Sequence, residues 1–192
     1  MPEIEFEPTK HEYRLKGKLY LSVTRCLSAA GLVNFEGIDP FYAERGTAVH
    51  RATELSDRGT LDELKLDPQL APYLAAWRDF RKTSGVIIRA IEKRFVCEPL
   101  EFAGTIDRVV SILGREGVLD IKTGNHYASH NVQLAAYAFG EQPKQPQKLA
   151  RWAVYLAEDG RFKLREFTDH SDFLVWQSCL TIARWKRKMG YD

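Results

Sequence analysis

An aspartate and a lysine two positions apart, Asp120 and Lys122, are the first residues whose types and spacing suggest chemistry. They end an apolar stretch, Gly117–Ile121, that predicts a β-strand, so both side chains leave the same face. A carboxylate can hold a divalent cation while a neighbouring ammonium contacts a water or the charge developing on a phosphate, as metal-assisted phosphodiester hydrolysis requires. The pair alone is weak evidence, because ion pairs of this kind are also common at strand edges.

A second carboxylate, Asp107, lies inside an otherwise apolar predicted strand, Phe102–Leu113. Buried carboxylates are rare unless they are paired or bind a metal. If Gly114–Arg115 is a two-residue turn, Asp107 lies opposite Lys122 and diagonal to Asp120, with about 7–8 Å between the two aspartate Cα atoms. The two carboxylates would then share one face and one cation. A one-residue slip would separate the faces, and a four-residue turn would move Asp107 out of reach.

His50 lies in a predicted helix, Asp39–Arg58, for which we expect a break or bend at Gly46. An imidazole can complete a set of two carboxylates around a divalent ion, more readily for Mn²⁺ than for Mg²⁺. Glu54, one helical turn later, is a candidate acceptor that would orient the imidazole ring. A single helical histidine is also commonly structural or solvated, and this alternative stays open.

Two further polar residues, Gln133 and Tyr137, lie one turn apart in the predicted helix Ser129–Gly140 and therefore share a face. They offer an amide donor and acceptor and a phenol. The alternative is a helix with a polar edge and a core tyrosine.

A basic run near the end of the sequence, Arg184–Lys188, contains a tryptophan. Arg184 and Lys186 are candidates to neutralise phosphates while the tryptophan stacks on a base. The alternative is that these cations only complement the dipole at the end of a helix.

The rest of the pattern predicts the elements that position these residues. We expect a mixed α/β fold, in which a sheet is flanked by helices. The expected strands are Glu12–Leu15, Leu19–Leu21, Val86–Val96, Phe102–Leu113, Gly117–Ile121, Leu149–Leu156 and Phe162–Phe167. The expected helices are a short one capped by Ser22, then Asp39–Arg58, Asp67–Ser84, Ser129–Gly140 and Ser171–Met189.

The composition excludes several classes of protein. A length of 192 residues with 44% hydrophobic and 28% charged residues is typical of one globular domain, residues 1–192. Three scattered cysteines, Cys26, Cys97 and Cys179, argue against a disulfide framework or an iron–sulfur site and favour a cytoplasmic location. No apolar run is long enough to span a membrane. The net charge of +2 means that nucleic-acid binding would need a local basic patch.

Taken together, the motifs resemble the RecB-like branch of the PD-(D/E)xK nuclease superfamily, which includes RecB and AddAB nuclease domains, CRISPR-adaptation nucleases and phage exonucleases. The resemblance covers about residues 12–140 and carries no iron–sulfur cluster. The matching motifs are Gly-x-x-x-His at Gly46–His50, Gly-x-x-Asp at Gly104–Asp107, Asp-x-Lys at Asp120–Lys122 and Gln-x-x-x-Tyr at Gln133–Tyr137.

The resemblance implies a restriction-endonuclease-like α/β fold with an N-terminal β-hairpin and a helical insertion. It implies a Mg²⁺- or Mn²⁺-dependent DNA nuclease, an exonuclease on DNA ends in bacterial or phage recombination or repair. The implied metal ligands are His50, Asp107, Asp120 and the carbonyl of Ile121, and the implied catalytic lysine is Lys122.

Glu92, on the strand before, matches a position where some members carry a functional acid, although it could also be a solvated strand residue. The resemblance also assigns Gln133 and Tyr137, with Thr105 of the Gly-x-x-Asp motif, to the substrate groove. We see no helicase motor motif, so a single-strand-binding, annealing or helicase partner would be separate, and an oligomer is compatible with the sequence. The alternatives are a silent module that binds DNA ends or a partner, and an endonuclease for single-stranded or structured DNA.

Overall fold

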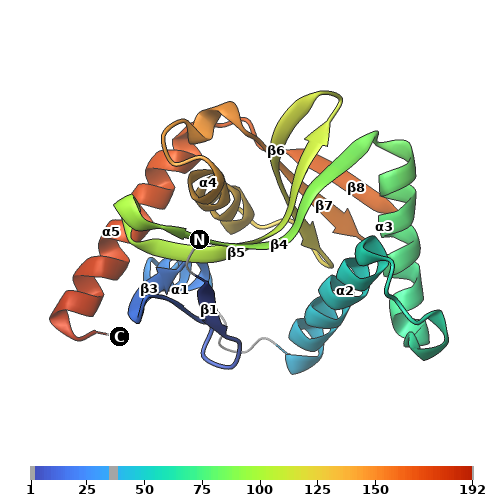
Figure 1. Cartoon of the computed structure of the whole chain (residues 1–192), viewed down its shortest axis with the longest axis horizontal. Helices are drawn as coiled ribbons and strands as arrows, with labels where there is room; N and C mark the ends of the chain where they lie inside the picture. The colour runs from blue at the N-terminus through green and yellow to red at the C-terminus, as the bar shows by residue number, and fades with distance from the viewer. Residues whose placement is uncertain (1–2, 35–38, 192) are drawn as a thin grey trace.

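A mixed β-sheet with helices on both faces forms the centre of the structure, a computed structural model that describes residues 3–34 and 39–191 (Figure 1). This confirms the expected fold class. The strands are β1 (Ile4–Glu7), β2 (Glu12–Leu15), β3 (Lys18–Ser22), β4 (Val86–Cys97), β5 (Phe102–Ile112), β6 (Arg115–Lys122), β7 (Ala150–Leu156) and β8 (Phe162–Glu166). The α-helices are α1 (Val23–Ala29), α2 (Pro40–Arg58), α3 (Ala71–Thr83), α4 (Ser129–Glu141) and α5 (Ser171–Met189). Short 3₁₀ turns are η1 (Glu63–Lys65), η2 (Pro68–Leu70), η3 (Glu98–Leu100) and η4 (Pro146–Lys148).

Strand β5 is the pivot of the sheet, because three strands pair with it. β4 runs antiparallel along one edge of β5 over its whole length. The other edge is shared: β3 pairs in parallel with Phe102–Ala103, and β6 pairs antiparallel with residues 108–112. Residues 104–107 therefore lie where β3 and β6 diverge, and we call this segment the fork of the sheet.

The helices form two layers around the sheet. α1, α4 and α5 cover one face, and α2 and α3 cover the other (Figure 1). α3 shows why it packs there: Tyr73, Leu74, Trp77 and Phe80 recur at helical spacing, and all four are buried. None of the helices in the described ranges is long and apolar enough to cross a membrane. The three cysteines are free and buried.

Capping residues set the ends of several helices. The side chain of Ser22 accepts a hydrogen bond from the backbone N–H of Arg25 and caps α1 as expected. Asp39 caps α2, whose first residue is Pro40, and Gly59 ends that helix in a left-handed conformation. The expected break at Gly46 is wrong, because α2 continues through this residue. β1 was not predicted at all.

The turn between β5 and β6 is one residue earlier than predicted. Ile112 pairs with Arg115, so the two-residue loop is Leu113–Gly114 rather than Gly114–Arg115. Both loop residues have positive φ, 50° and 79°, which is the pattern of a type I′ turn. Pairs along the two strands shift by two positions, and Val109 faces Val118 instead of Asp120. A shift of two positions keeps every side chain on its face.

Candidate active site

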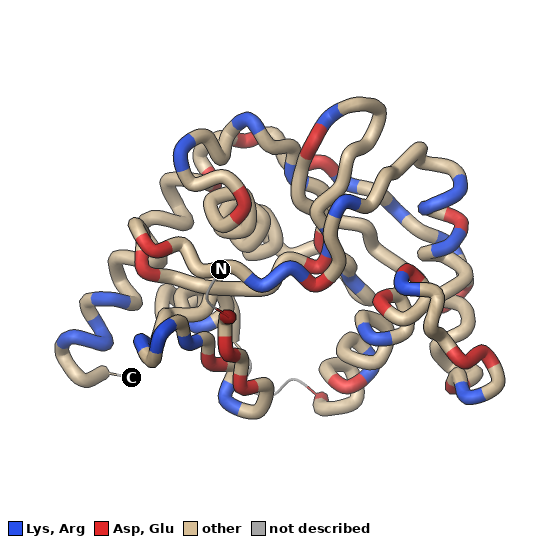
Figure 2. The backbone as a smooth tube through the Cα atoms, in the orientation of Figure 1, with Lys and Arg blue, Asp and Glu red and all other residues tan. Residues whose placement is uncertain are grey.

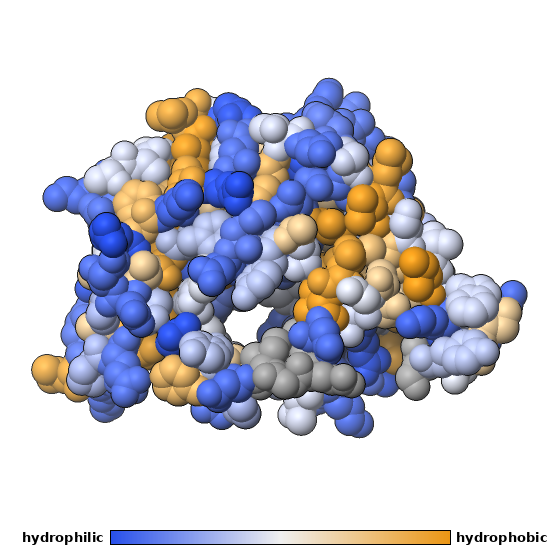
Figure 3. Space-filling view, turned by 180° about the vertical axis from the view of Figure 1, so that it is seen from behind, coloured by the Kyte–Doolittle hydropathy of each residue, from blue (hydrophilic) through white to orange (hydrophobic). Residues whose placement is uncertain are grey.

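A cleft of about 740 Å³ opens beside the fork of the sheet. It lies between the N-terminal strands and α2, where the space-filling view shows the molecule hollowed (Figure 3). Residues from eight helices and strands line it with a mixture of acids, cations and hydrogen-bonding groups. Those predicted from the sequence are His50, Glu92, Thr105, Asp107, Asp120, Lys122, Gln133 and Tyr137.

Three potential ligand atoms converge in this cleft, one each from His50 on α2, Glu92 on β4 and Asp107 on β5. All three lie within 4.8 Å of one another. His50 Nδ1 lies 3.4 Å from Asp107 Oδ2. Asp107 Oδ2 also accepts a 2.7 Å hydrogen bond from the backbone N–H of Ile121. That bond fixes the carboxylate across the fork, where the two strands have stopped pairing.

Asp120 and Lys122 lie next to this group and contact each other. Asp120 Oδ2 is 2.6 Å from Lys122 Nζ. The contact is an ion pair, and Asp120 Oδ2 is buried without a hydrogen-bond partner among the described residues. Lys122 Nζ also donates to Gln133 Oε1 at 3.0 Å, and Gln133 Nε2 donates to the Tyr137 hydroxyl at 2.7 Å. Gln133 and Tyr137 thus hold the lysine, a contact that the sequence did not reveal.

The register correction changes how the two aspartates face each other. Arg108 pairs with Leu119, so continuing the same register one step places Asp107 beside Asp120 rather than beside Lys122. The prediction that both carboxylates leave the same face agrees with this register. In this register the two aspartates lie opposite each other rather than diagonally.

Glu92 reaches the site through an unusual backbone conformation. Its φ is 48°, in the left-handed region that residues with a Cβ rarely adopt, although it lies within β4. Such a conformation costs of order 1 kcal/mol and persists only where the surroundings impose it, often at functional sites. Glu92, a solvated strand residue in one interpretation of the sequence, is thus among the converging groups.

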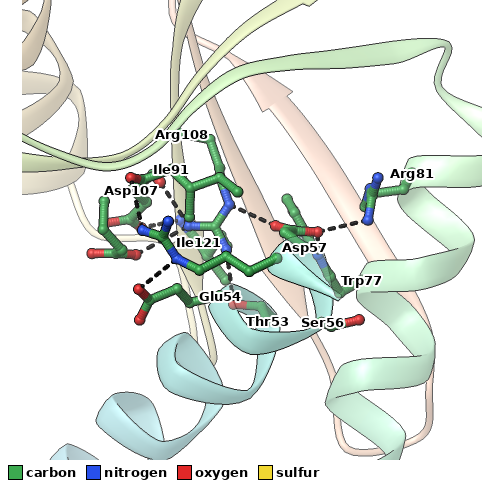
Figure 4. A network of polar contacts seen from close by, with 12 residues as sticks. Thr53, Glu54, Ser56, Asp57, Trp77, Arg81, Ile91, Asp107, Arg108 and Ile121 are labelled. Atoms are coloured by element: carbon green, nitrogen blue, oxygen red, sulfur yellow. Dashed lines mark hydrogen bonds and ion pairs between the residues drawn. The ribbon is translucent and has the colours of Figure 1, made fainter. Parts of the chain in front are cut away.

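A buried arginine, Arg108, lies beside Asp107 and contacts Asp57 (Figure 4). Arg108 is fully buried. Its guanidinium donates to Glu92 Oε1 at 3.0 Å, to the Asp107 carbonyl at 2.6 Å and to Asp57 Oδ2 at 2.7 Å. Asp57 is in turn bound by Arg81 at 2.7 Å and by the indole N–H of Trp77 at 3.0 Å. Sequence reasoning missed Arg108 and Asp57, which lie 51 positions apart.

The crowded acids have perturbed proton affinities. Burial raises the pKa of Glu92 to about 7, and the nearby Asp107 carboxylate adds to the shift. Burial also raises the pKa of Asp120 to about 6, although the Lys122 ammonium opposes the change. The pKa of the Tyr137 phenol is raised well above its usual value, first by burial and then by Asp120. Each raised pKa means that the ionised, negatively charged form of the group is disfavoured in this cleft.

The donor set fits a divalent cation. One imidazole and several carboxylates, with one carboxylate oxygen that lacks a hydrogen bond, are the ligand types that suit Mn²⁺ and Mg²⁺. His50, Glu92 and Asp107 would hold the ion, with Asp120 at its side. This set differs from the predicted one by including Glu92. A ligand role for Asp120 and for the carbonyl of Ile121 stays a prediction.

Other predicted residues lie elsewhere or have other partners. Glu54 does not orient His50, because its carboxylate pairs with Arg51 at 2.7 Å and Arg58 at 3.0 Å. Thr105 lines the cleft and shares a 2.9 Å hydrogen bond with the Tyr13 hydroxyl.

The basic run at the end of α5 does not reach the cleft. Arg184 donates to the carbonyl of Leu100, and neither Arg184 nor Lys186 is among the residues that line the cleft. A DNA-binding role for these two residues stays a prediction.

Comparisons with known proteins gave structural likeness only. No protein-family model and no curated protein sequence matches this chain. Among solved structures, it is similar to LHK-Exo in complex with dAMP, with 13% sequence identity and a TM-score of 0.40, covering 90% of this chain and 94% of that one. It is also similar to the alkaline exonuclease LHK-Exo from Laribacter hongkongensis, with 12% identity, a TM-score of 0.34 and the same coverage.

Proposed function

We propose that this protein is a divalent-metal-dependent deoxyribonuclease that hydrolyses phosphodiester bonds. The observation that carries the proposal is the convergence of His50, Glu92 and Asp107 within 4.8 Å, beside the Asp120–Lys122 pair, in one open cleft. Paired acids with a neighbouring ammonium are the groups that metal-assisted phosphoryl transfer needs.

Each side chain has a role that follows from its contacts. His50, Glu92 and Asp107 would hold a Mg²⁺ or Mn²⁺ ion, which would supply Lewis acidity to a phosphate oxygen and lower the pKa of a bound water. Lys122 places its ammonium beside the scissile phosphate and offsets negative charge in the transition state. Gln133 fixes the direction of that ammonium through the 3.0 Å hydrogen bond to Lys122. Ile121 keeps Asp107 in place through its backbone N–H.

Within this class we favour an exonuclease that acts on DNA ends in bacterial or phage recombination or repair, which is what the motif resemblance implies. A single-strand-binding, annealing or helicase protein is the corresponding partner. These finer assignments rest on the sequence motifs.

The test is a cleavage assay on linear and circular DNA with Mg²⁺ or Mn²⁺, with and without EDTA. We expect degradation of linear DNA that EDTA abolishes and that Lys122→Ala and Asp107→Ala lack. Nicking or linearisation of circles would indicate an endonuclease instead. DNA binding without cleavage under every metal condition would overturn the enzymatic proposal and leave a silent binding module.

A further inference from the structure

The cations that line the cleft differ in whether their charge is already engaged. Arg51 and Arg58 both pair with the carboxylate of Glu54. Lys122 pairs with Asp120. The guanidinium of Arg94, on β4, makes no hydrogen bond or ion pair with any residue in the ranges that the structure describes, although Arg94 lines the same cleft and is exposed.

Arg94 is nevertheless held in place. Its guanidinium carbon lies 5.2 Å from the centre of the Phe6 ring, a cation–π distance. Phe6 itself packs on Tyr13, with ring centroids 4.7 Å apart, and Tyr13 is bound to Thr105. The Phe6 ring therefore supports the guanidinium, while Arg94 itself stays exposed to solvent.

The position of Arg94 relative to the acids is also fixed. It lies two residues beyond Glu92 on β4 and pairs across the strands with Thr105, which is two residues before Asp107. Basic and acidic residues follow one another along this central part of the chain trace (Figure 2). A planar guanidinium with free donors is the group best suited to bind a phosphate oxygen pair.

We propose that Arg94, supported by Phe6, binds a backbone phosphate of the nucleic acid near the scissile one. The inference rests on the proposed nuclease function and adds to it a binding residue that lies outside the recognised motifs. Arg94 is a positioning residue for the substrate and takes no part in the bond cleavage.

The experiment measures binding of a short fluorescent DNA duplex in EDTA, where it is not cut, as a function of salt. Neutralising one phosphate contributes about 0.9 to the slope of log affinity against log salt. Arg94→Gln should lower that slope by about 0.9 and weaken binding about eightfold at about 0.1 M salt, with the difference vanishing towards about 1 M. The control Arg89→Gln, on the same strand but outside the cleft, should leave the slope unchanged.

Two further variants separate charge from support. Arg94→Lys keeps the charge and should keep the slope. Phe6→Leu as a single substitution should also keep the salt slope but weaken DNA binding about two- to fivefold. Added to Arg94→Gln, the same substitution should not change the affinity for DNA further. An unchanged slope in Arg94→Gln, or equal effects of Phe6→Leu in both backgrounds, would overturn the inference.

Parallel cleavage assays distinguish failure of the inference from failure of the proposed function. Wild-type protein that cuts DNA while Arg94→Gln keeps the full salt slope refutes the role of Arg94 alone. Wild-type protein that neither cuts nor binds DNA refutes both.

Discussion

Replacing the buried Arg108 with methionine should destabilise the protein by about 3 kcal/mol. The substitution keeps an unbranched side chain of similar length against Trp77, over which the guanidinium lies at 5.4 Å. It removes the donor to Asp57, Glu92 and the Asp107 carbonyl at the same time.

The magnitude follows from the partners that are left. Removing one member of a buried ion pair costs about 3–5 kcal/mol, because the remaining charge is uncompensated. Asp57 is only 1% exposed but keeps its contacts with Arg81 and Trp77, so we expect the lower end of this range. For a chain of this length, the loss corresponds to a decrease of about 6–12 °C in Tm.

The assay is urea unfolding followed by far-ultraviolet circular dichroism, without metal. The matched control is Arg89→Met, whose side chain is 54% exposed and 3.5 Å from Glu116, and it should change the free energy of unfolding by less than about 0.5 kcal/mol. A loss below about 1 kcal/mol in Arg108→Met would show that the buried network does not hold the acids as described.

Two further predictions concern the cleft, and a third concerns His130 on α4. Lys122→Met, in protein that circular dichroism shows to be folded, should reduce kcat by at least about 100-fold, because the ammonium acts on charge in the transition state; a kcat within tenfold of wild type would contradict this role. Asp120→Asn should abolish cleavage yet raise the free energy of unfolding in EDTA at pH 8 by up to about 3 kcal/mol. The reason is that the pKa of Asp120 in the folded state, about 6, exceeds the usual 3.8, so ionisation of Asp120 destabilises the folded protein. A less stable variant would refute the electrostatic reasoning. Burial lowers the pKa of His130 to about 3, with a contribution from Lys122, so below pH 6.5 the unfolded chain binds a proton that the folded chain does not. Stability should therefore decline from about pH 6.5 towards pH 3, less steeply in His130→Gln, and equal slopes in urea titrations would contradict the assignment.

The sequence carried the essential part of the site because strand periodicity is robust. Asp107 and Asp120 share a face in any register that differs by an even number of positions, so the misplaced turn did not disturb this prediction. The turn itself was missed because Leu113 adopts a positive φ of 50°, against the preference of a leucine.

The supporting residues could not be predicted in the same way. Glu92 turns into the cleft through a left-handed backbone that no local pattern indicates. Arg108 and Asp57 meet only after the sheet and α2 have packed, and a charge within an apolar strand has no visible partner until then. The hydrogen bond that Lys122 donates to Gln133 likewise depends on how α4 packs against β6.

The strands on the two sides of the fork are attached to β5 through ladders of different length. Within the described ranges, two residue pairs, Leu21 with Phe102 and Ser22 with Ala103, join β3 to β5, whereas longer ladders join β4 and β6 to β5. These longer ladders therefore set the spacing of the carboxylates. A displacement of the N-terminal strands would leave that spacing unchanged.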